Sequence, residues 1–389
     1  MAEWLKLLGC LPKAPHYAFD WDGLAQTALQ PLFKKLAQVP QNPEYHGEGD
    51  VWTHTRMVCE ALVQLSAFRA LPERQQQEIA LAALLHDIGK IPATKWEDGK
   101  WTSPHHSSTG AQMARELLWK EYHLCGTPEK QQFRETVCFL IRYHMTPSHL
   151  LDHSDPARRA VTLAANGQLC PDFTLALLCL LAEADTLGRM APDTQELLEK
   201  VQLCAEAAHE VGCLHQPAPF ASQVTQHAYL NGRNVWPMQE LFDDCWGEII
   251  LLSGLPGTGK DTWISKNHPE LPVVCLDDIR REMNISNADN QGPVVQAAME
   301  QARVYLRAHQ PFIWNATCIS PMKRQKQLRL FEQYGARARI VYLETGWKEN
   351  LRRNSDRKAV VPEGVIERML SQLIPPEYIE AQTVEWRCT

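Results

Sequence analysis

Glu248-Ile-Ile-Leu-Leu-Ser-Gly-Leu-Pro-Gly-Thr-Gly-Lys-Asp-Thr262 is the stretch that decides the fold of the second part of this 389-residue chain. An apolar run leads into a glycine-rich turn that ends in a lysine, which predicts a strand, a loop and the start of a helix. Glycines let the backbone turn tightly enough to point several N–H groups inward, and the lysine adds a positive charge for the β and γ phosphates. The pattern predicts a nucleoside triphosphate site, formed by Gly254, Gly257, Thr258, Gly259, Lys260, Asp261 and Thr262.

One position departs from the pattern that such phosphate-binding loops follow. The residue after Lys260, where a serine or threonine usually holds magnesium, is Asp261, and Thr262 follows one place later. The departure leaves the magnesium ligand open, whereas triphosphate binding is still predicted. We expect ATP, or another nucleoside triphosphate, together with Mg²⁺. The alternative for this stretch is a surface turn between two elements.

Length and composition predict two globular domains, since 44% of the residues are hydrophobic and 22% are charged. We place them at residues 1–235 and 236–389, because prolines, glycines and mixed polarity between Leu214 and Trp246 interrupt the helical pattern. The net charge of −7 comes from the first part, because residues 248–389 hold 19 Lys+Arg against 17 Asp+Glu. Twelve cysteines without a C-x-x-C pair favour reduced thiols in a cytoplasmic protein. We expect neither a signal peptide nor a membrane span.

The first domain is predicted to be an all-α bundle, because apolar residues recur at helical spacing and no alternating strand pattern competes. The expected helices cover residues 50–68, 75–86, 109–122, 129–144 and 172–189. They carry His54, the adjacent His86 and Asp87, and Asp185. A carboxylate buried without a partner is strongly destabilising, and a bound cation would remove that cost.

Mixed imidazole and carboxylate ligands suit a divalent transition ion, and the sequence leaves open whether it is manganese, nickel, cobalt, iron or zinc. Such an ion makes hydroxide from water near neutral pH and neutralises a phosphate oxygen. The alternative for any single histidine here is an ordinary core or surface residue.

At these residues the domain resembles the HD phosphohydrolase superfamily, whose pattern is H…HD…D on a helical bundle. The resemblance covers about residues 45 to 190 and is carried by HDIGK at His86–Lys90 and H-x-x-x-G-A at His106–Ala111. It implies that His54, His86, Asp87 and Asp185 are the metal ligands. It also implies a role on a second metal or on the substrate phosphate for Lys90, His106, His144 and Arg189. His105 is the alternative to His106, and solvated surface charges are the alternative for Lys90 and Arg189.

In the second domain, apolar runs at residues 273–276, 312–314 and 340–343 alternate with helical stretches at 293–308, 322–334 and 364–373. This alternation predicts an α/β domain with a parallel sheet between helices. Ligands of such sheets bind beyond the carboxyl ends of the strands. Asp277 follows the second strand and could accept a proton from an attacking hydroxyl, while Arg280 could hold a neighbouring phosphate. Arg353 and Arg357 are four residues apart, so on a helix they would share a face that closes over transferring phosphates.

This half resembles the P-loop polynucleotide 5′-kinases, through the glycine-rich loop, the D-x-x-R after the second strand and the R-N-x-x-R stretch followed by V-P. The resemblance implies that Lys260 binds the phosphates, that Asp277 is the general base for a 5′-hydroxyl and that Arg280 binds the adjacent phosphate of the acceptor. It places Arg353 and Arg357 on the donor phosphates. The whole chain resembles the bacterial HD-Pnk end-healing enzymes, which implies a 5′-OH polynucleotide kinase coupled to a 2′,3′-phosphatase acting on RNA or DNA ends, ahead of a nucleic-acid ligase.

Two other functions stay open. One is a small-molecule nucleotide or nucleoside kinase joined to a nucleotide phosphohydrolase, although Arg280 and the basic run from Lys323 to Arg329 favour a polymer. The other is a kinase regulated by an HD domain that senses a metal or nucleotide without catalysis. An HD half that binds phosphate compounds but does not hydrolyse them would distinguish the last function from the first two.

Overall fold

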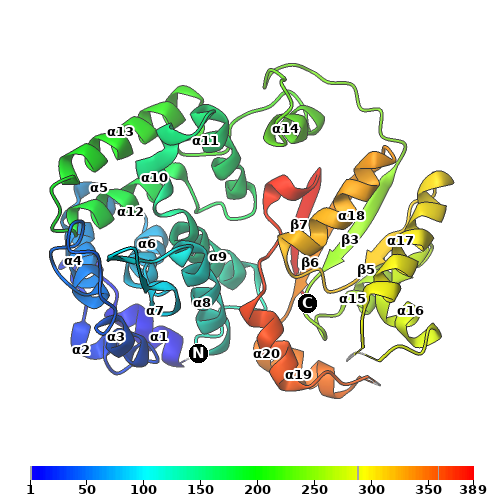
Figure 1. Ribbon diagram of the computed structural model, residues 1–389, viewed down its shortest axis with the longest axis horizontal. Helices are drawn as coiled ribbons and strands as arrows, with labels where there is room; N and C mark the ends of the chain where they lie inside the picture. The colour runs from blue at the N-terminus through cyan, green and yellow to red at the C-terminus, as the bar shows by residue number, and fades with distance from the viewer. Residues whose placement is uncertain (1, 287–288, 358) are drawn as a thin grey trace. The chain divides into compact units, whose positions relative to one another are not determined.

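The computed structural model describes residues 2–286, 289–357 and 359–389. The chain forms two compact units (Figure 1). The first comprises the chain up to Leu124 together with Glu129–Ala218, and the second comprises Cys125–Pro128 together with Pro219–Thr389.

The first unit is a bundle of helices, as predicted. Its elements are α1 (Ala2–Cys10), α2 (Trp21–Leu24), α3 (Gln30–Leu36), α4 (Val51–Gln64), α5 (Ser66–Ala70), α6 (Glu73–Leu85), α7 (Lys90–Ala93), β1 (Lys95–Glu97), β2 (Lys100–Thr102), α8 (His106–Lys120), α9 (Pro128–Tyr143), α10 (Thr146–His149), η1 (Leu150–Asp152), α11 (Pro156–Ala164), η2 (Ala165–Gln168), α12 (Leu175–Leu187) and α13 (Thr194–Glu210).

Two N-caps show how local chemistry sets these bounds. The Asp50 carboxylate accepts hydrogen bonds from the backbone N–H groups of Trp52 and Thr53 at the start of α4. Thr174 accepts from Leu177 at the start of α12. Helices α4, α6 and α12 pack on one another, and their apolar residues form the core that surrounds the first candidate site.

A two-stranded hairpin interrupts the helices and was not predicted. Strands β1 and β2 pair antiparallel, with Trp96 opposite Trp101. The turn is Asp98-Gly99, and both residues have positive φ, 50° and 77°. An Asp-Gly turn of this kind matches the twist of the two strands, so the signal for the hairpin was present in the sequence.

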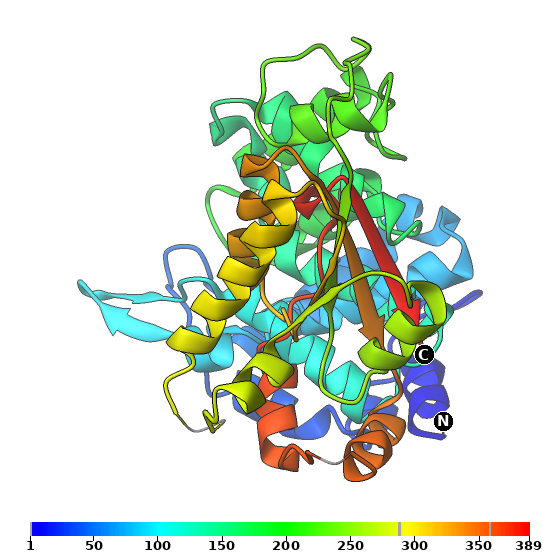
Figure 2. The ribbon, with the colours of Figure 1, turned by 90° about the vertical axis from the view of Figure 1, so that its right-hand side faces the viewer.

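The second unit is α/β, as predicted, with a five-stranded parallel sheet in the order β4-β5-β3-β6-β7. Its strands are β3 (Glu248–Ser253), β4 (Val273–Cys275), β5 (Ile313–Asn315), β6 (Arg337–Glu344) and β7 (Thr383–Cys388). Its helices are α14 (Gln223–Leu230), α15 (Lys260–Asn267), α16 (Leu276–Glu282), α17 (Gly292–Arg307), α18 (Pro321–Gln333), α19 (Trp347–Ser355), α20 (Glu363–Ser371) and η3 (Tyr378–Glu380). Figure 2 shows the strands of the sheet with α17 packed alongside.

Strand β3 is the central strand of the sheet, between β5 and β6, and its residues 249–253 are buried. Ile250 and Leu252 point into a cluster that includes Ile313 and Val341 from the two neighbouring strands, with Trp263 of α15 packed against it. A parallel strand buried on both sides reads as a continuous apolar run, which is the pattern of this stretch. The chain therefore delivers the glycine-rich loop at the carboxyl end of the central strand.

The twelve cysteines are free thiols that lie buried or half-buried. Within the described residues, no helix combines the length and the apolar character needed to cross a membrane.

Candidate functional sites

The four residues predicted as metal ligands converge in the core of the first unit. His54 comes from α4, His86 and Asp87 from the end of α6, and Asp185 from the last turn of α12. The Nε2 atom of His54 lies 3.0 Å from Asp185 Oδ1, 3.4 Å from His86 Nε2 and 3.7 Å from Asp87 Oδ2. The distance from His86 Nε2 to Asp87 Oδ2 is 3.3 Å. Residues more than 100 positions apart in sequence thus present their donor atoms to one point.

The imidazoles around this point are oriented by their other nitrogen. Nδ1 of His86 donates to the carbonyl of Ala83 at 2.8 Å, and Nδ1 of His144 donates to Ile141 at 2.7 Å. Nδ1 of His106 likewise donates to the Ser103 carbonyl at 2.9 Å. A proton fixed on Nδ1 leaves Nε2 with a lone pair, which is the arrangement of histidines that bind metals.

The donor set fits a divalent cation. Within the described part of the chain, both carboxylate oxygens of Asp87 and Nε2 of His106 are buried without a hydrogen bond, although Lys90 Nζ forms an ion pair with Asp87 Oδ2 at 2.8 Å. Asp87 belongs to two groups of possible ligands, one with His54 and His86 and one with His106 and His144. The first group holds three of the four predicted ligands, Asp185 contacts His54 beside it, and Lys90, His106 and His144 lie next to Asp87 or His86.

Two glycines bring Lys90 and His106 to this point. A Cβ atom on Gly89 would lie 2.0 Å from the carbonyl oxygen of His106, and one on Gly110 would lie 3.2 Å from the Gly89 nitrogen. The starts of α7 and α8 can therefore touch only because both positions lack a side chain. His106 is buried and faces Asp87 Oδ1 at 3.4 Å, whereas His105 is exposed in a left-handed conformation.

Arg189 follows Gly188, whose carbonyl lies 3.3 Å from His54 Nδ1, but its own side chain pairs with Asp193. Helix α12 ends at Leu187 rather than at Arg189. Its C-cap Gly188 packs against Val58, where a Cβ atom would lie 2.6 Å from the backbone, so only glycine fits there. The Arg189 guanidinium is 3.4 Å from the Asp193 carboxylate. The structure thus brings seven of the eight predicted residues of this half together, and a role for Arg189 stays a prediction.

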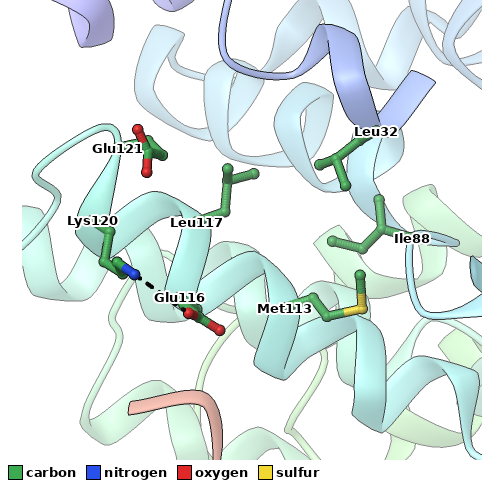
Figure 3. A pocket seen from close by; sticks show the side chains of 7 residues that line it. All are labelled: Leu32, Ile88, Met113, Glu116, Leu117, Lys120 and Glu121. Carbon is green, nitrogen blue, oxygen red and sulfur yellow. Dashed lines mark ion pairs between the residues drawn. The ribbon is translucent and has the colours of Figure 1, made fainter. Parts of the chain in front are cut away.

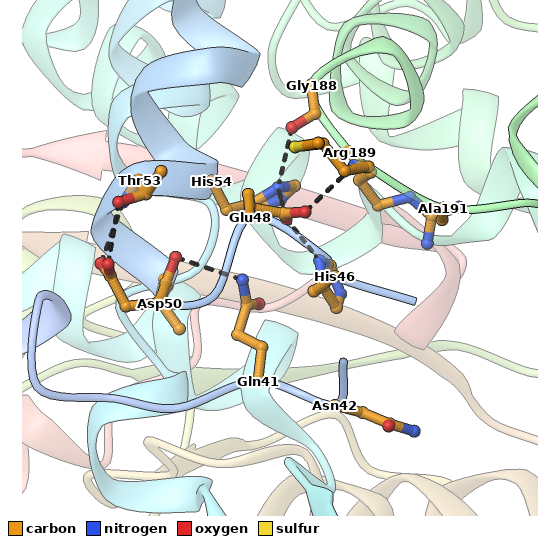
Figure 4. A network of polar contacts seen from close by, with 12 residues as sticks. Gln41, Asn42, His46, Glu48, Asp50, Thr53, His54, Gly188, Arg189 and Ala191 are labelled. Carbon is orange, nitrogen blue, oxygen red and sulfur yellow. Dashed lines mark hydrogen bonds and ion pairs between the residues drawn. The ribbon is translucent and has the colours of Figure 1, made fainter. Parts of the chain in front are cut away.

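Sequence reasoning missed Glu48, which holds the outer side of His54 (Figure 4). Its Oε1 atom lies 3.0 Å from His54 Nδ1 and 2.8 Å from His46 Nδ1, and its Oε2 atom accepts from the Met190 N–H at 3.0 Å. Its side chain is 1% exposed. No motif marks a lone glutamate in a loop, so only the fold reveals it.

The charges of this centre shift the protonation of its members. Burial lowers the pKa of His54, but Asp185 and Glu48 outweigh burial and raise it to about 9. Burial, with the neighbouring His86, lowers the pKa of His144 to about 4. Burial raises the pKa of Asp87, yet Lys90 and His86 outweigh it and hold this pKa well below its usual value. Without a metal, the centre therefore combines ionised carboxylates and a protonated His54 with the neutral imidazole of His144, and a bound cation would take the place of the His54 proton.

The second site is the glycine-rich loop between β3 and α15. Gly254, Gly257 and Gly259 have φ values of 147°, 83° and 82°, which only glycine adopts without strain. The half-buried Lys260 donates to the carbonyls of Gly254 and Leu255 at 3.0 and 2.8 Å. Burial lowers the pKa of Lys260 to about 8. Thr258 is buried and bonds back to the Leu255 carbonyl, so its side chain supports the loop.

The residue that departs from the usual pattern has a partner on the neighbouring strand. Asp261 is exposed at the start of α15, and its Oδ1 accepts a hydrogen bond from Nδ2 of Asn315 at 2.7 Å. Asn315 is the last residue of β5, which pairs with β3. P-loop enzymes usually hold magnesium with a hydroxyl after the lysine and an aspartate at the end of a strand. In this chain a carboxylate follows the lysine, and a neutral amide stands at the strand end. Thr262 is exposed beside them.

The acceptor-side residues lie after β4. Asp277 and Arg280 are on α16, where Arg280 Nη1 is 2.5 Å from Asp277 Oδ1 and Arg280 Nε donates to Gln291. Arg357 Nη2 is 3.8 Å from Asp277 Oδ2. The structure thus brings these three predicted residues together.

The expectation that Arg353 and Arg357 share one helix face was wrong, since α19 ends at Ser355. The side chain of Asn354 bonds both backbone groups of Val361, which folds the chain back at this point. Arg353 stays in the helix and reaches the glycine-rich loop, because its Nη1 would lie 3.5 Å from a Cβ atom on Gly259. The basic run of α18 is also not one exposed face, since Arg324 is fully buried in an ion pair with Glu380.

A hollow of about 240 Å³ lies elsewhere on the first unit (Figure 3). Its lining is mostly apolar, with one ion pair between Glu116 and Lys120 at 3.8 Å, and it consists of Leu32, Ile88, Met113, Glu116, Leu117, Lys120 and Glu121. None of the predicted site residues lines it, so we assign it no part in the chemistry.

Comparison with known families agrees with both domain folds. The model of the HD domain family matches residues 51–205, and the model of an AAA domain family matches residues 249–376. The fold and the two sites thus define a chain with an HD phosphohydrolase-type domain followed by a P-loop kinase-like domain. An HD domain implies a bound divalent metal, and a P-loop domain implies a nucleotide with Mg²⁺.

Curated relatives carry the name multifunctional CCA protein. The one from Hahella chejuensis is 31% identical over 172 residues, which cover 42% of this chain and 35% of the relative. The one from Teredinibacter turnerae is 28% identical, covering 41% and 35%, and the one from Xanthomonas campestris pv. campestris is 28% identical, covering 49% and 43%. The chain thus spans roughly a third to two fifths of the length of the curated relatives it matches.

Proposed function

We propose that the chain is a bifunctional enzyme that heals nucleic-acid ends. The kinase half transfers a phosphoryl group from a nucleoside triphosphate to a 5′-hydroxyl, and the HD half removes 2′,3′-cyclic, 2′- or 3′-phosphates. The observation that carries the proposal is one chain with two phosphate-chemistry centres, of which the second pairs a carboxylate with an arginine on its acceptor side. Ends treated in this way are the substrates that a nucleic-acid ligase joins, and such a partner stays a prediction from the chemistry.

In the HD half, His54, His86, Asp87 and Asp185 would hold a divalent ion. When bound, such an ion neutralises a phosphate oxygen and lowers the pKa of water. Lys90 flanks Asp87 and would present its ammonium group to a substrate phosphate. His106, with its proton on Nδ1, would offer the Nε2 lone pair to a second metal. His144 is buried as a neutral imidazole beside His86 and could relay a proton. Glu48 keeps His54 in its orientation.

In the kinase half, Lys260 and the glycine-rich loop would hold the β and γ phosphates. We assign the magnesium contact to the Asp261 carboxylate, oriented by Asn315, because this pair keeps one carboxylate and one neutral group at the place where P-loop enzymes bind the ion. Asp277 would accept the proton of the 5′-hydroxyl, and Arg280 would bind the phosphate next to it. Arg353 and Arg357 would stabilise charge on the transferring phosphate.

One substrate tests both halves. A short RNA with a 5′-hydroxyl and a 2′,3′-cyclic phosphate is incubated with ATP, Mg²⁺ and Mn²⁺, and both ends are resolved by mass. A gain of phosphate at the 5′ end together with loss at the 3′ end is expected. Consumption of ATP with neither end changed would show that the acceptor is a small molecule. The sensor function would be favoured if the kinase half phosphorylates the 5′ end while the metal-loaded HD half binds phosphate compounds without hydrolysing them.

A further inference from the structure

The hairpin β1–β2 carries an exposed tryptophan that the fold does not need for its core. Trp96 is 58% exposed, and Figure 2 shows the hairpin, in cyan, projecting from the helices of the first unit. Its cross-strand neighbour Trp101 contacts it edge-on, with ring centroids 5.1 Å apart. This contact covers one part of the indole and leaves the remainder open to solvent. Trp96 and Trp101 together thus present aromatic surface on a projecting element.

The base of the hairpin is attached to the HD centre on both sides. Strand β1 follows α7, which begins with Lys90. Strand β2 leads into α8, which begins with His106. Thr94 and Ser103, at the two ends of the hairpin, are bonded through their hydroxyls at 2.8 Å. The carbonyl of Ser103 also accepts the Nδ1 proton of His106 at 2.9 Å. The position of the hairpin is therefore fixed relative to the residues that flank Asp87.

The size and charge of the hairpin indicate what it would bind. Three residues in each strand extend about 10 Å, which is about three steps of a stacked nucleic-acid strand. Its four charged residues, Lys95, Glu97, Asp98 and Lys100, cancel, and Lys95 already pairs with Glu97 at 2.6 Å. Attraction of phosphates is thus a minor contribution. Stacking of a base on the indole is favourable for every base and is insensitive to salt compared with phosphate contacts.

We propose that Trp96 is a stacking platform for a base of a single-stranded nucleic acid whose terminal phosphate enters the HD centre. The inference rests on the proposed function, since it requires that the HD half acts on a polynucleotide end. The hairpin would hold the strand near its end and would leave the reacting groups untouched. Its contribution is therefore to binding of longer substrates and not to the chemical step.

The test compares two substrates in the full-length protein. An oligonucleotide that ends in a 3′-phosphate can reach the hairpin, whereas a nucleoside 3′-phosphate has no further base to stack. For Trp96→Ala we expect the KM of the oligonucleotide to rise about 5- to 150-fold, with kcat unchanged. Turnover of the mononucleotide should stay at the wild-type value, which also shows that the variant is folded. Trp96→Tyr keeps an aromatic ring and should restore most of the lost affinity.

Results other than the expected selective loss on the oligonucleotide would overturn the inference. An equal loss on both substrates would assign Trp96 to the scaffold of the hairpin, and no loss on either would leave the tryptophan without a role in binding. A wild-type enzyme that hydrolyses only the mononucleotide would exclude a polymer. If the wild type hydrolyses neither substrate, the proposed function of the HD half fails by itself. The stacking role of Trp96 is then tested by the Kd of a fluorescently labelled oligonucleotide. Equal Kd values for the wild type and Trp96→Ala would refute that role.

Discussion

The buried contact between Glu48 and His54 leads to a quantitative prediction about metal affinity. Glu48→Gln keeps the shape of the side chain and a hydrogen-bond acceptor but removes the negative charge 3.0 Å from His54 Nδ1. Loss of such a supporting contact typically weakens metal binding 10- to 100-fold, which is about 1.4 to 2.7 kcal/mol. The carbonyl of Gly188 also lies 3.3 Å from the same nitrogen and can still hold the ring. We therefore expect a loss close to tenfold.

The assay is calorimetric titration of the apo protein with Mn²⁺, in competition with a chelator of known affinity. Glu44→Gln is the matched control, because Glu44 is exposed four residues earlier and the change removes the same charge. An unchanged Mn²⁺ affinity in Glu48→Gln would refute the role of Glu48 in orienting His54. The same loss in both variants would show that only the overall charge of the loop matters.

Three further predictions address the two halves and the stability of the first. Lys260→Ala should lower kinase activity about 100-fold or more and leave phosphatase activity unchanged. Asp87→Ala should lower phosphatase activity and leave kinase activity unchanged. One change that abolishes both activities would contradict separate sites. Asp261→Ser should weaken Mg²⁺-dependent binding of a fluorescent ATP analogue about tenfold, and adding Asn315→Asp should restore it by returning the carboxylate to the strand; if the double variant binds no better than the single one, the pair is not the magnesium contact. Burial raises the pKa of Glu78 to about 9, so folding takes up a proton between the unfolded value near 4.5 and pH 9. The unfolding free energy should fall with rising pH in this window by at most about 1.4 kcal/mol per pH unit, and a Glu78→Gln variant with the same pH dependence in denaturant titrations would disprove this.

Much of the fold was predictable because its signals are local. The apolar run before Gly254 and the alternation of strands and helices gave the parallel sheet, and helical periodicity gave the bundle. Histidine and aspartate at the ends of apolar helices also indicated a shared centre, because buried carboxylates need a charge partner. The geometry places these side chains together, whereas their roles stay predictions.

The remaining features depend on contacts between distant residues. Glu48 reaches His54 only through a loop, and the hydrogen bond between Asp261 and Asn315 requires that β5 lies beside β3. The end of α19 depends on the side chain of Asn354 bonding to Val361, which periodicity cannot show. The hairpin at Asp98-Gly99 is different, because its turn signal was present in the sequence, in the connection between two predicted helices.

The burial of the cysteines has a practical consequence for spectroscopy. Burial raises the pKa of Cys138 to about 12 and that of Cys59 well above its usual value. Thiols of this kind stay protonated at neutral pH and react slowly with maleimides. A cysteine introduced on the hairpin by Lys100→Cys, at an exposed position, would therefore be modified ahead of buried thiols such as these. A fluorophore attached there would report in real time when a strand arrives at the hairpin and when it leaves.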